Sequence, residues 1–295
     1  MGVVERQARR WTVMAGAALS AVFLIFLGAS AAFAEQAVDW QIGMQPAASP
    51  VREHIDALSN ELLVIITLIT ILVVGLLCYA ILRFNAKRHP VPSKTSHNPL
   101  LEVTWTVVPV LILVIIAVPS FKLLYYDAKA QHPQMTIKVT GHQWYWTYEY
   151  PDQGNFSFDS NILSAADDQK AGKPRLLGVN NPVVVPVGTV IRVLITSTDV
   201  IHSWFVPSMG VQEYAVIGRT NESWLEALHE GTYYGQCNQI CGVNHPFMPI
   251  EIDAVSKADF AKWAAQAKQK FARNDAPAAA PAGPAPVRLA AAAAR

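Results

Sequence analysis

The sequence predicts a membrane hairpin of two transmembrane helices followed by an all-β domain, a sandwich or Greek-key barrel of many short strands. Two stretches of about twenty residues contain no charged side chain, and that length lets a helix cross a bilayer. Between residues 135 and 255, short apolar runs are separated by prolines and glycines, as in sheets of short strands. The chain of 295 residues is 52% hydrophobic, and its net charge of +1 gives no indication of nucleic-acid binding.

Residues 1–34 are expected to be a secretory signal peptide. A basic start that includes Arg9 and Arg10 precedes an apolar core, Val13–Leu27, and Ala32-Phe33-Ala34 forms a cleavage site of the A-x-A type. An uncleaved third span is the alternative. Residues 35–60 follow as a polar exported segment.

Residues 61–126 are predicted to form the two-helix hairpin, with Leu62–Leu82 and Val103–Phe121 as its uncharged spans. The loop between them, residues 83–99, is basic and is therefore expected on the cytoplasmic side. Its positive charges are Arg83, Lys87, Arg88 and Lys94. Pro109 and Pro119 interrupt the second span, which indicates packing against other membrane helices.

Residues 127–273 are predicted to be the β domain. Ile137 and Val139 alternate with polar residues, but beyond Gly141 the large apolar residues change parity, which suggests a bulge or bend. Further strands are expected in three runs, Ile191–Ile195, Gly231–Gly235 and Pro249–Ala254. Ser256 with Asp259 predicts a capped helix, and the Ala/Pro-rich residues 274–295 predict a disordered tail.

One loop of this domain, Cys237–Met248, concentrates metal-binding side chains with the spacing C-x3-C-x3-H-x2-M. A second imidazole, His202, precedes a run that reads as strand. Soft thiolate and thioether donors beside imidazole suit copper. A disulfide is an alternative in an exported domain, and so is zinc, which needs no methionine.

A pair of copper ions bridged by two thiolates would use every donor in this set. The predicted ligands are two bridging cysteines, two terminal histidines, a weak thioether and a backbone carbonyl: Cys237 and Cys241, His202 and His245, Met248, and Gln239. Such a pair shares its charge over both metals and both sulfurs, so one electron can move with little displacement of any atom. The site therefore suits electron transfer.

Three motifs, Cys237–Ile250, Asp199–Trp204 and Gly141–Trp146, resemble those of cytochrome c oxidase subunit II. The resemblance covers residues 55 to 271 or so. It implies a cupredoxin-like domain with a binuclear copper A centre that takes electrons from cytochrome c. It further implies that these electrons pass to subunit I, which carries haem and copper B. There oxygen would be reduced to water, coupled to proton translocation. The expected location is the bacterial inner membrane, among other oxidase subunits, with the copper domain in the periplasm.

The resemblance also implies roles for residues outside the copper loop. Trp144 matches the aromatic through which electrons enter, with Tyr145 beside it. Nearby carboxylates would attract a lysine-rich cytochrome c, and the candidates are Glu149, Asp152, Asp159 and Asp199. Glu102 matches a carboxylate at the entrance of a proton path, although a simple charge at a helix N-terminus explains it equally. His142 is expected to be structural.

The chain departs from the family where Gln239 replaces a glutamate. That glutamate gives its carboxylate to a magnesium or manganese ion shared with subunit I, and a neutral amide is a poorer ligand for a hard cation. The shared ion is therefore in doubt here. Rival identities are a copper-delivery protein, a quinol oxidase subunit and nitrous oxide reductase. A copper-delivery protein needs exchangeable ligands, but here the ligands are split between distant segments. A quinol oxidase subunit lacks the copper ligands, which are all present here. Nitrous oxide reductase lacks the membrane spans that this chain has.

Overall fold

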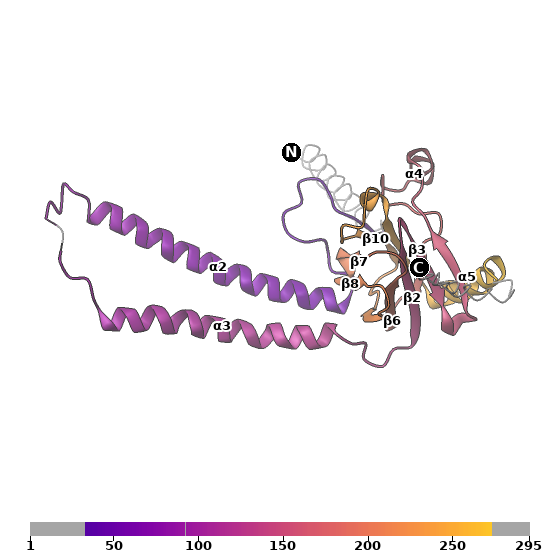
Figure 1. Ribbon diagram of the computed structural model, residues 1–295, viewed down its shortest axis with the longest axis horizontal. Coiled ribbons are helices and arrows are strands. Elements are labelled where there is room, and N and C mark those ends of the chain that lie inside the picture. Colours follow the sequence, from indigo (N-terminus) through magenta and orange to yellow (C-terminus); the bar gives the residue numbers. More distant parts are fainter. Residues whose placement is uncertain (1–32, 92, 273–295) are drawn as a thin grey trace, which may run out of the picture.

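The computed structural model describes residues 33–91 and 93–272. The core of the predicted signal peptide and the predicted tail lie outside these residues. Two long helices form a hairpin that projects from a β domain (Figure 1). The helices are α2 Pro50–Arg83, α3 Pro99–Asp127, α4 Ala165–Ala171 and α5 Lys257–Lys270. The strands are β1 Phe33–Glu35, β2 Met135–His142, β3 Tyr145–Tyr150, β4 Phe156–Ser160, β5 Val183–Pro186, β6 Ile191–Ser197, β7 His202–Val206, β8 Val211–Ala215, β9 Asn221–Leu225, β10 Gly231–Cys237 and β11 Pro249–Val255.

The hairpin helices contain the two predicted spans in full and extend beyond them. With 34 and 29 residues, α2 and α3 are both longer than the roughly 20 residues that cross a bilayer. The Ser49 side chain accepts a hydrogen bond from the Arg52 N–H, and proline follows Ser49 in the first turn. Helix α2 therefore begins well before Leu62, so residues 50–60 of the predicted polar segment are helical.

The β domain consists of two sheets whose buried side chains form one hydrophobic core. One sheet has the order β5-β11-β10-β7-β8, with β1 paired to β10, and the other has the order β4-β3-β2-β6-β9. Non-consecutive neighbours in both sheets require crossovers between them, as in Greek-key sandwiches. The predicted fold class, a two-helix membrane hairpin followed by a cupredoxin-like sandwich, is confirmed.

The parity change near Gly141 is a hairpin turn, so the expected bulge or bend is wrong. β2 ends at His142, and β3 runs back antiparallel from Tyr145, with Gly141 opposite Trp146. Because an odd-numbered residue faces an even-numbered one across this hairpin, the buried side chains change parity when the chain reverses. Trp144 consequently lies in the turn and not in a strand.

The first turn of α2 is anchored to the β domain beside the loop that follows β7. The buried Arg52 guanidinium donates to the carbonyl oxygens of Gln45 and Pro207 and pairs with Asp56 at 2.8 Å. The Ser49 hydroxyl donates to the Met209 carbonyl. The membrane hairpin and the sandwich are therefore joined by buried polar contacts as well as by the chain itself.

The two ends of the β domain contain the predicted cleavage point after Ala34 and the predicted helix cap at Ser256. The predicted cleavage point after Ala34 lies within β1, which runs parallel to β10. At the other end, the Ser256 side chain accepts from the Asp259 N–H at 3.1 Å, which confirms the predicted cap of α5. One face of α5 packs on the core through Phe260 and Ala267.

Candidate metal centre

Two adjacent strands deliver the first two candidate ligands. His202 is the first residue of β7, and Cys237 is the last residue of β10. These strands pair antiparallel, with Cys237 opposite Trp204. The chain then forms a loop and re-enters the sheet at β11. The Cys237 N–H at the start of this loop donates to the Met248 carbonyl at its end, at 3.0 Å. The loop is therefore closed at its base by the sheet.

The structure brings the candidate sulfurs and imidazoles together. The ligand atoms of His202, Cys237 and Cys241 all lie within 4.8 Å of one another, and all three side chains are buried. The His202 Nδ1 lies 3.9 Å from the Cys237 Sγ, and the Cys241 Sγ lies 3.5 Å from the Nδ1 of His245. Two thiols and two imidazoles thus converge from segments separated by 35 residues.

The main chain of each remaining candidate donor contacts Cys237. The backbone carbonyl oxygen of Gln239 is 3.4 Å from the Cys237 Sγ. Met248 is buried in the same hydrophobic cluster as both cysteines. The two sulfurs are 3.9 Å apart, far beyond the roughly 2.05 Å of a disulfide bond, and both cysteines are free. The arrangement is that of an open dithiol with nitrogen and oxygen donors around it.

The two thiols differ in how readily they ionise. Burial opposes ionisation of Cys237, but its hydrogen bond with His202 holds its pKa below the usual value. Burial raises the pKa of Cys241, and the adjacent charge of Cys237 raises it further. Two thiolates this close therefore require a cation near both sulfurs, and the buried donor set fits soft metal ions such as copper.

A carboxylate holds the outer nitrogen of His202. The Asp199 Oδ1 lies 2.9 Å from the His202 Nε2, which leaves Nδ1 directed at the thiols. Burial of the imidazole opposes its protonation, yet the contacts with Cys237 and Asp199 raise the pKa of His202. Histidine ligands commonly donate their second N–H to a carboxylate in this way. Sequence reasoning placed Asp199 among docking charges and missed this contact, although its position three residues before His202 was a usable signal.

Close backbone approach fixes the other side of the His202 ring. A Cβ at Gly141 would lie 2.8 Å from the His202 Cδ2, closer than real Cβ atoms come. The Trp146 ring meets the imidazole edge-on at 5.9 Å between centroids. His202 is fully buried. Its ring is confined by the Asp199 carboxylate, the backbone at Gly141 and the Trp146 indole.

The β2–β3 turn covers the metal-binding loop. The Trp144 Nε1 donates to the Cys241 carbonyl at 3.2 Å, and the Gln143 Nε2 donates to the same oxygen at 2.7 Å. A Cβ at Gly242, where φ is +122°, would lie 2.9 Å from the Trp144 ring. The half-buried Trp144 therefore lies directly on the loop. Gln143 binds the same carbonyl oxygen of Cys241, and the sequence analysis missed it although it is next to Trp144.

Tyr145 and His142 form a separate pair at the base of this turn. Their rings stack with centroids 4.6 Å apart, and the His142 Nδ1 lies 2.8 Å from the Thr198 hydroxyl. Burial lowers the pKa of His142. These contacts are those of a structural histidine.

The other candidate docking carboxylates have local partners. Glu149 lies 3.7 Å from the Lys138 ammonium across the β2–β3 pair. Asp152 accepts from a backbone N–H, and Asp159 accepts from the Thr147 hydroxyl at 2.6 Å. All three remain at the surface, but each charge is partly used within the domain.

Helix α3 begins at the end of the hairpin remote from the β domain (Figure 1), and Glu102 belongs to its first turn. Its carboxylate accepts from the Asn98 N–H at 3.3 Å, while the Asn98 side chain accepts from Leu101. This reciprocal pattern is a capping contact of the first turn of α3. The simple helix-terminus reading accounts for this contact.

Comparison with known proteins follows the same division of the chain. A family model described as cytochrome c oxidase subunit II, periplasmic domain, matches residues 135–255. A second, described as the transmembrane domain of the same subunit, matches residues 37–123. Together the two matches cover the hairpin and the sandwich.

Individual relatives are similar over most of the chain. A probable cytochrome c oxidase subunit 2 from Rickettsia bellii is 48% identical over 250 residues, which are 85% of this chain and 92% of the relative. Cytochrome c oxidase subunit 2 of Oenothera berteroana is 46% identical over 238 residues, 79% of this chain and 92% of the relative. A crystal structure of the periplasmic domain of subunit II of cytochrome oxidase from Bradyrhizobium japonicum is 50% identical, covers 48% of this chain and 99% of that one, and has a TM-score of 0.46.

Proposed function

The chain belongs to the cytochrome c oxidase subunit II family, and from that membership we propose that it accepts electrons from cytochrome c at a binuclear copper A centre. It is a subunit of a haem–copper oxidase, an oxidoreductase complex of the inner membrane. In the proposed role it passes electrons to haem in subunit I, where oxygen is reduced to water and protons are translocated. The convergence of His202, Cys237 and Cys241 supports this proposal most directly.

The residues that would hold the two copper ions are the six candidate donors. Cys237, Cys241, His202 and His245 would supply the sulfur and nitrogen ligands. The carbonyl oxygen of Gln239 and the thioether of Met248 would complete the set. When bound, the pair supplies reversible one-electron chemistry at nearly fixed geometry.

The protein contributes rigidity and exclusion of water. Cys237, Cys241 and Met248 are 6%, 4% and 1% exposed, so solvent reaches none of the sulfurs freely. His202 lies at the start of a strand and is held by Asp199 on its outer nitrogen. Ligands fixed in this way move little when charge is gained or lost, which favours fast electron transfer.

Trp144 is the proposed point of electron entry. Its indole is half-buried and hydrogen-bonded to the carbonyl of Cys241, a proposed ligand. An arriving electron would therefore have a direct route from the surface to the loop. Asp159 of β4 lies opposite Thr147 of β3, on the side of this turn. Glu149 of β3 and Asp152 of η1 (Pro151–Gln153) lie toward the far end of the β2–β3 pair, beside Lys138 and Thr136. All three would act mainly on the rate of encounter with a positively charged cytochrome c.

Copper is the proposed resident metal of the domain. The carbonyl of Gln239 is available, but its side chain offers only a neutral amide oxygen, which hard cations bind less well than carboxylate. We therefore do not extend the proposal to a magnesium or manganese ion shared with subunit I. The copper domain would face the periplasm, with residues 83–99 on the cytoplasmic side and Glu102 near the start of a proton path.

Copper content of the full chain, purified in detergent and titrated with copper, tests the site. We expect two copper ions per chain and a visible absorption band, because two thiolates bind both metals. Cys237→Ser should abolish both signals. Cys78→Ser is the matched control, since Cys78 lies exposed on α2 and should leave them intact. Binding of a single zinc ion, or copper retained by Cys237→Ser, would refute the assignment.

Electron entry is tested in the assembled oxidase with Trp144→Phe. The smaller ring keeps aromatic packing on the loop but loses the indole hydrogen bond to Cys241. We expect slower oxidation of reduced cytochrome c at unchanged copper content. Tyr145→Phe removes only a hydroxyl and serves as the control. Loss of copper in Trp144→Phe would show that the indole holds the loop and would contradict a role in electron entry alone.

A further inference from the structure

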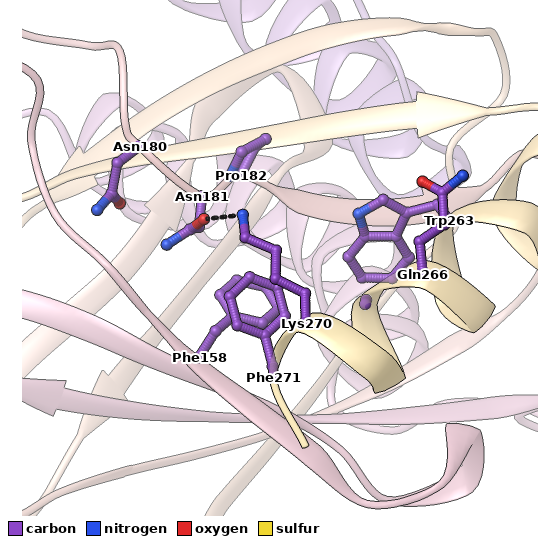
Figure 2. A pocket seen from close by; sticks show the side chains of 9 residues that line it. Phe158, Asn180, Asn181, Pro182, Trp263, Gln266, Lys270 and Phe271 are labelled. Carbon is purple, nitrogen blue, oxygen red and sulfur yellow. Dashed lines mark hydrogen bonds between the residues drawn. The ribbon is translucent and has the colours of Figure 1, made fainter. Parts of the chain in front are cut away.

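A groove on the sandwich lies between strand β4 and helix α5, and no residue of the metal-binding loop lines it. It has a volume of about 250 Å³. Its aromatic walls are Phe158 of β4, Trp263 of α5 and Phe271 just beyond α5 (Figure 2). The residues that precede β5 form the opposite rim, and Asn181 there accepts a hydrogen bond from the Lys270 ammonium at 3.3 Å.

The groove also presents hydrogen-bond donors that nothing in the described chain uses. The side-chain amides of Asn180 and Gln266 line it, as does the indole of Trp263. None of the amide N–H groups of Asn180 and Gln266, nor the indole N–H, has an acceptor among residues 33–91 and 93–272. Aromatic walls with free donors are what a polyproline II segment requires, since its rings pack on aromatics and its carbonyl oxygens have no internal partner.

The chain itself supplies a segment of that chemistry. Beyond the described residues, the sequence contains prolines at 277, 281, 284 and 286. Pro281-Ala282-Gly283-Pro284 has the P-x-x-P spacing, and a polyproline II helix has three residues per turn. Pro281 and Pro284 would therefore lie on the same face, about 9 Å apart.

The groove lies where the tail begins. Phe271 lines the groove, and Pro281 is ten residues further along the chain. Ten residues reach roughly 33 Å when extended, so the tail can turn back across the groove without disturbing α5. A tethered segment also binds at a high effective concentration, which offsets the weak affinity of a short peptide.

We propose that Pro281–Pro284 of this same chain docks in the groove as a polyproline II segment. The two prolines pack against Trp263 and the neighbouring phenylalanines, and the amides of Asn180 and Gln266 donate to the carbonyl oxygens of the segment. The tail is thereby folded back onto the domain. This inference is independent of copper binding and of electron transfer.

Photo-crosslinking of the full chain tests the proposal from the tail side. Benzoyl-phenylalanine replaces Ala282, and the crosslinked peptides are identified by mass spectrometry. We expect an intramolecular crosslink to residues 180–182 or to α5. Pro281→Ser with Pro284→Ser should lower its yield by about tenfold, the loss typical of removing a dominant contact, whereas Pro286→Ser should not. Crosslinks to another copy, another subunit or elsewhere in the chain would overturn the proposal, as would no crosslink.

A second pair of variants tests the groove side. Gln266→Glu replaces a donor with an acceptor at an exposed position, so folding should be unaffected and the crosslink yield should fall. Gln269→Glu makes the same change on the same helix at a residue that does not line the groove. Equal yields in the two variants would overturn the proposed hydrogen bonds.

Discussion

Replacing Gly141 with alanine tests whether the backbone of β2 sets the position of His202. A Cβ at this position would lie 2.8 Å from the His202 Cδ2 and 3.1 Å from its Cγ. Gly141 lies in extended strand backbone, which alanine adopts without strain. Steric conflict with the imidazole is therefore the only penalty that the substitution introduces.

The size of the effect follows from how the ring is held. Ordinary contact begins at 3.4 Å, so the imidazole would have to retreat by 3.4 − 2.8 = 0.6 Å. Asp199 holds its outer nitrogen at 2.9 Å and the Trp146 ring lies at its edge, which restricts the retreat. Overpacking of this kind costs about 1–3 kcal/mol of folding stability. Loss of a residue that orients a metal ligand weakens metal binding by about 10–100-fold. A displaced His202 should weaken copper binding by a similar factor.

Copper titration and urea unfolding of the full chain in detergent measure these two effects separately. Gly75→Ala is the matched control, because nothing lies within 4 Å of a Cβ there and α2 favours alanine. We expect unchanged copper affinity in the control. Unaltered affinity and stability in Gly141→Ala would refute the claim that this glycine positions the ring.

Two further substitutions test charges near the domain core. Asp199→Asn should weaken copper binding by about 10–100-fold, since the carboxylate orients His202, while Asp159→Asn, which loses only a surface contact, should not; equal effects in copper titrations would contradict this. Burial raises the pKa of Asp253 in the folded protein. The protonated carboxyl group therefore contributes its full stability below the unfolded pKa, and this stability is lost as pH rises through the folded pKa. Asp253→Asn, which can still accept from Thr232, should therefore raise the urea midpoint at pH 7 but not near pH 3, and a lower midpoint at pH 7 would show that the reasoning is wrong.

Local patterns in the sequence were sufficient for the membrane hairpin and the end of the domain. Uncharged apolar spans of sufficient length become helices because the bilayer leaves no other way to satisfy the backbone. The cap at Ser256 involves residues three apart, so it too can be read locally. The start of α2 was missed although the Ser49 cap, three residues before Arg52, is an equally local signal; only the anchoring of Arg52 against the β domain depends on tertiary structure.

The types of donor, and therefore copper as the predicted metal, came from the sequence alone, because ligand softness is a property of the residue. The set of ligands stays a prediction, and only the fold brings His202 within reach of Cys237, through pairing of β7 with β10. Tertiary structure also decided that Asp199 holds an imidazole and that Trp144 lies in a turn over Cys241. Contacts between residues 35 to 98 positions apart depend on strand order and register, and short-range periodicity does not contain that information.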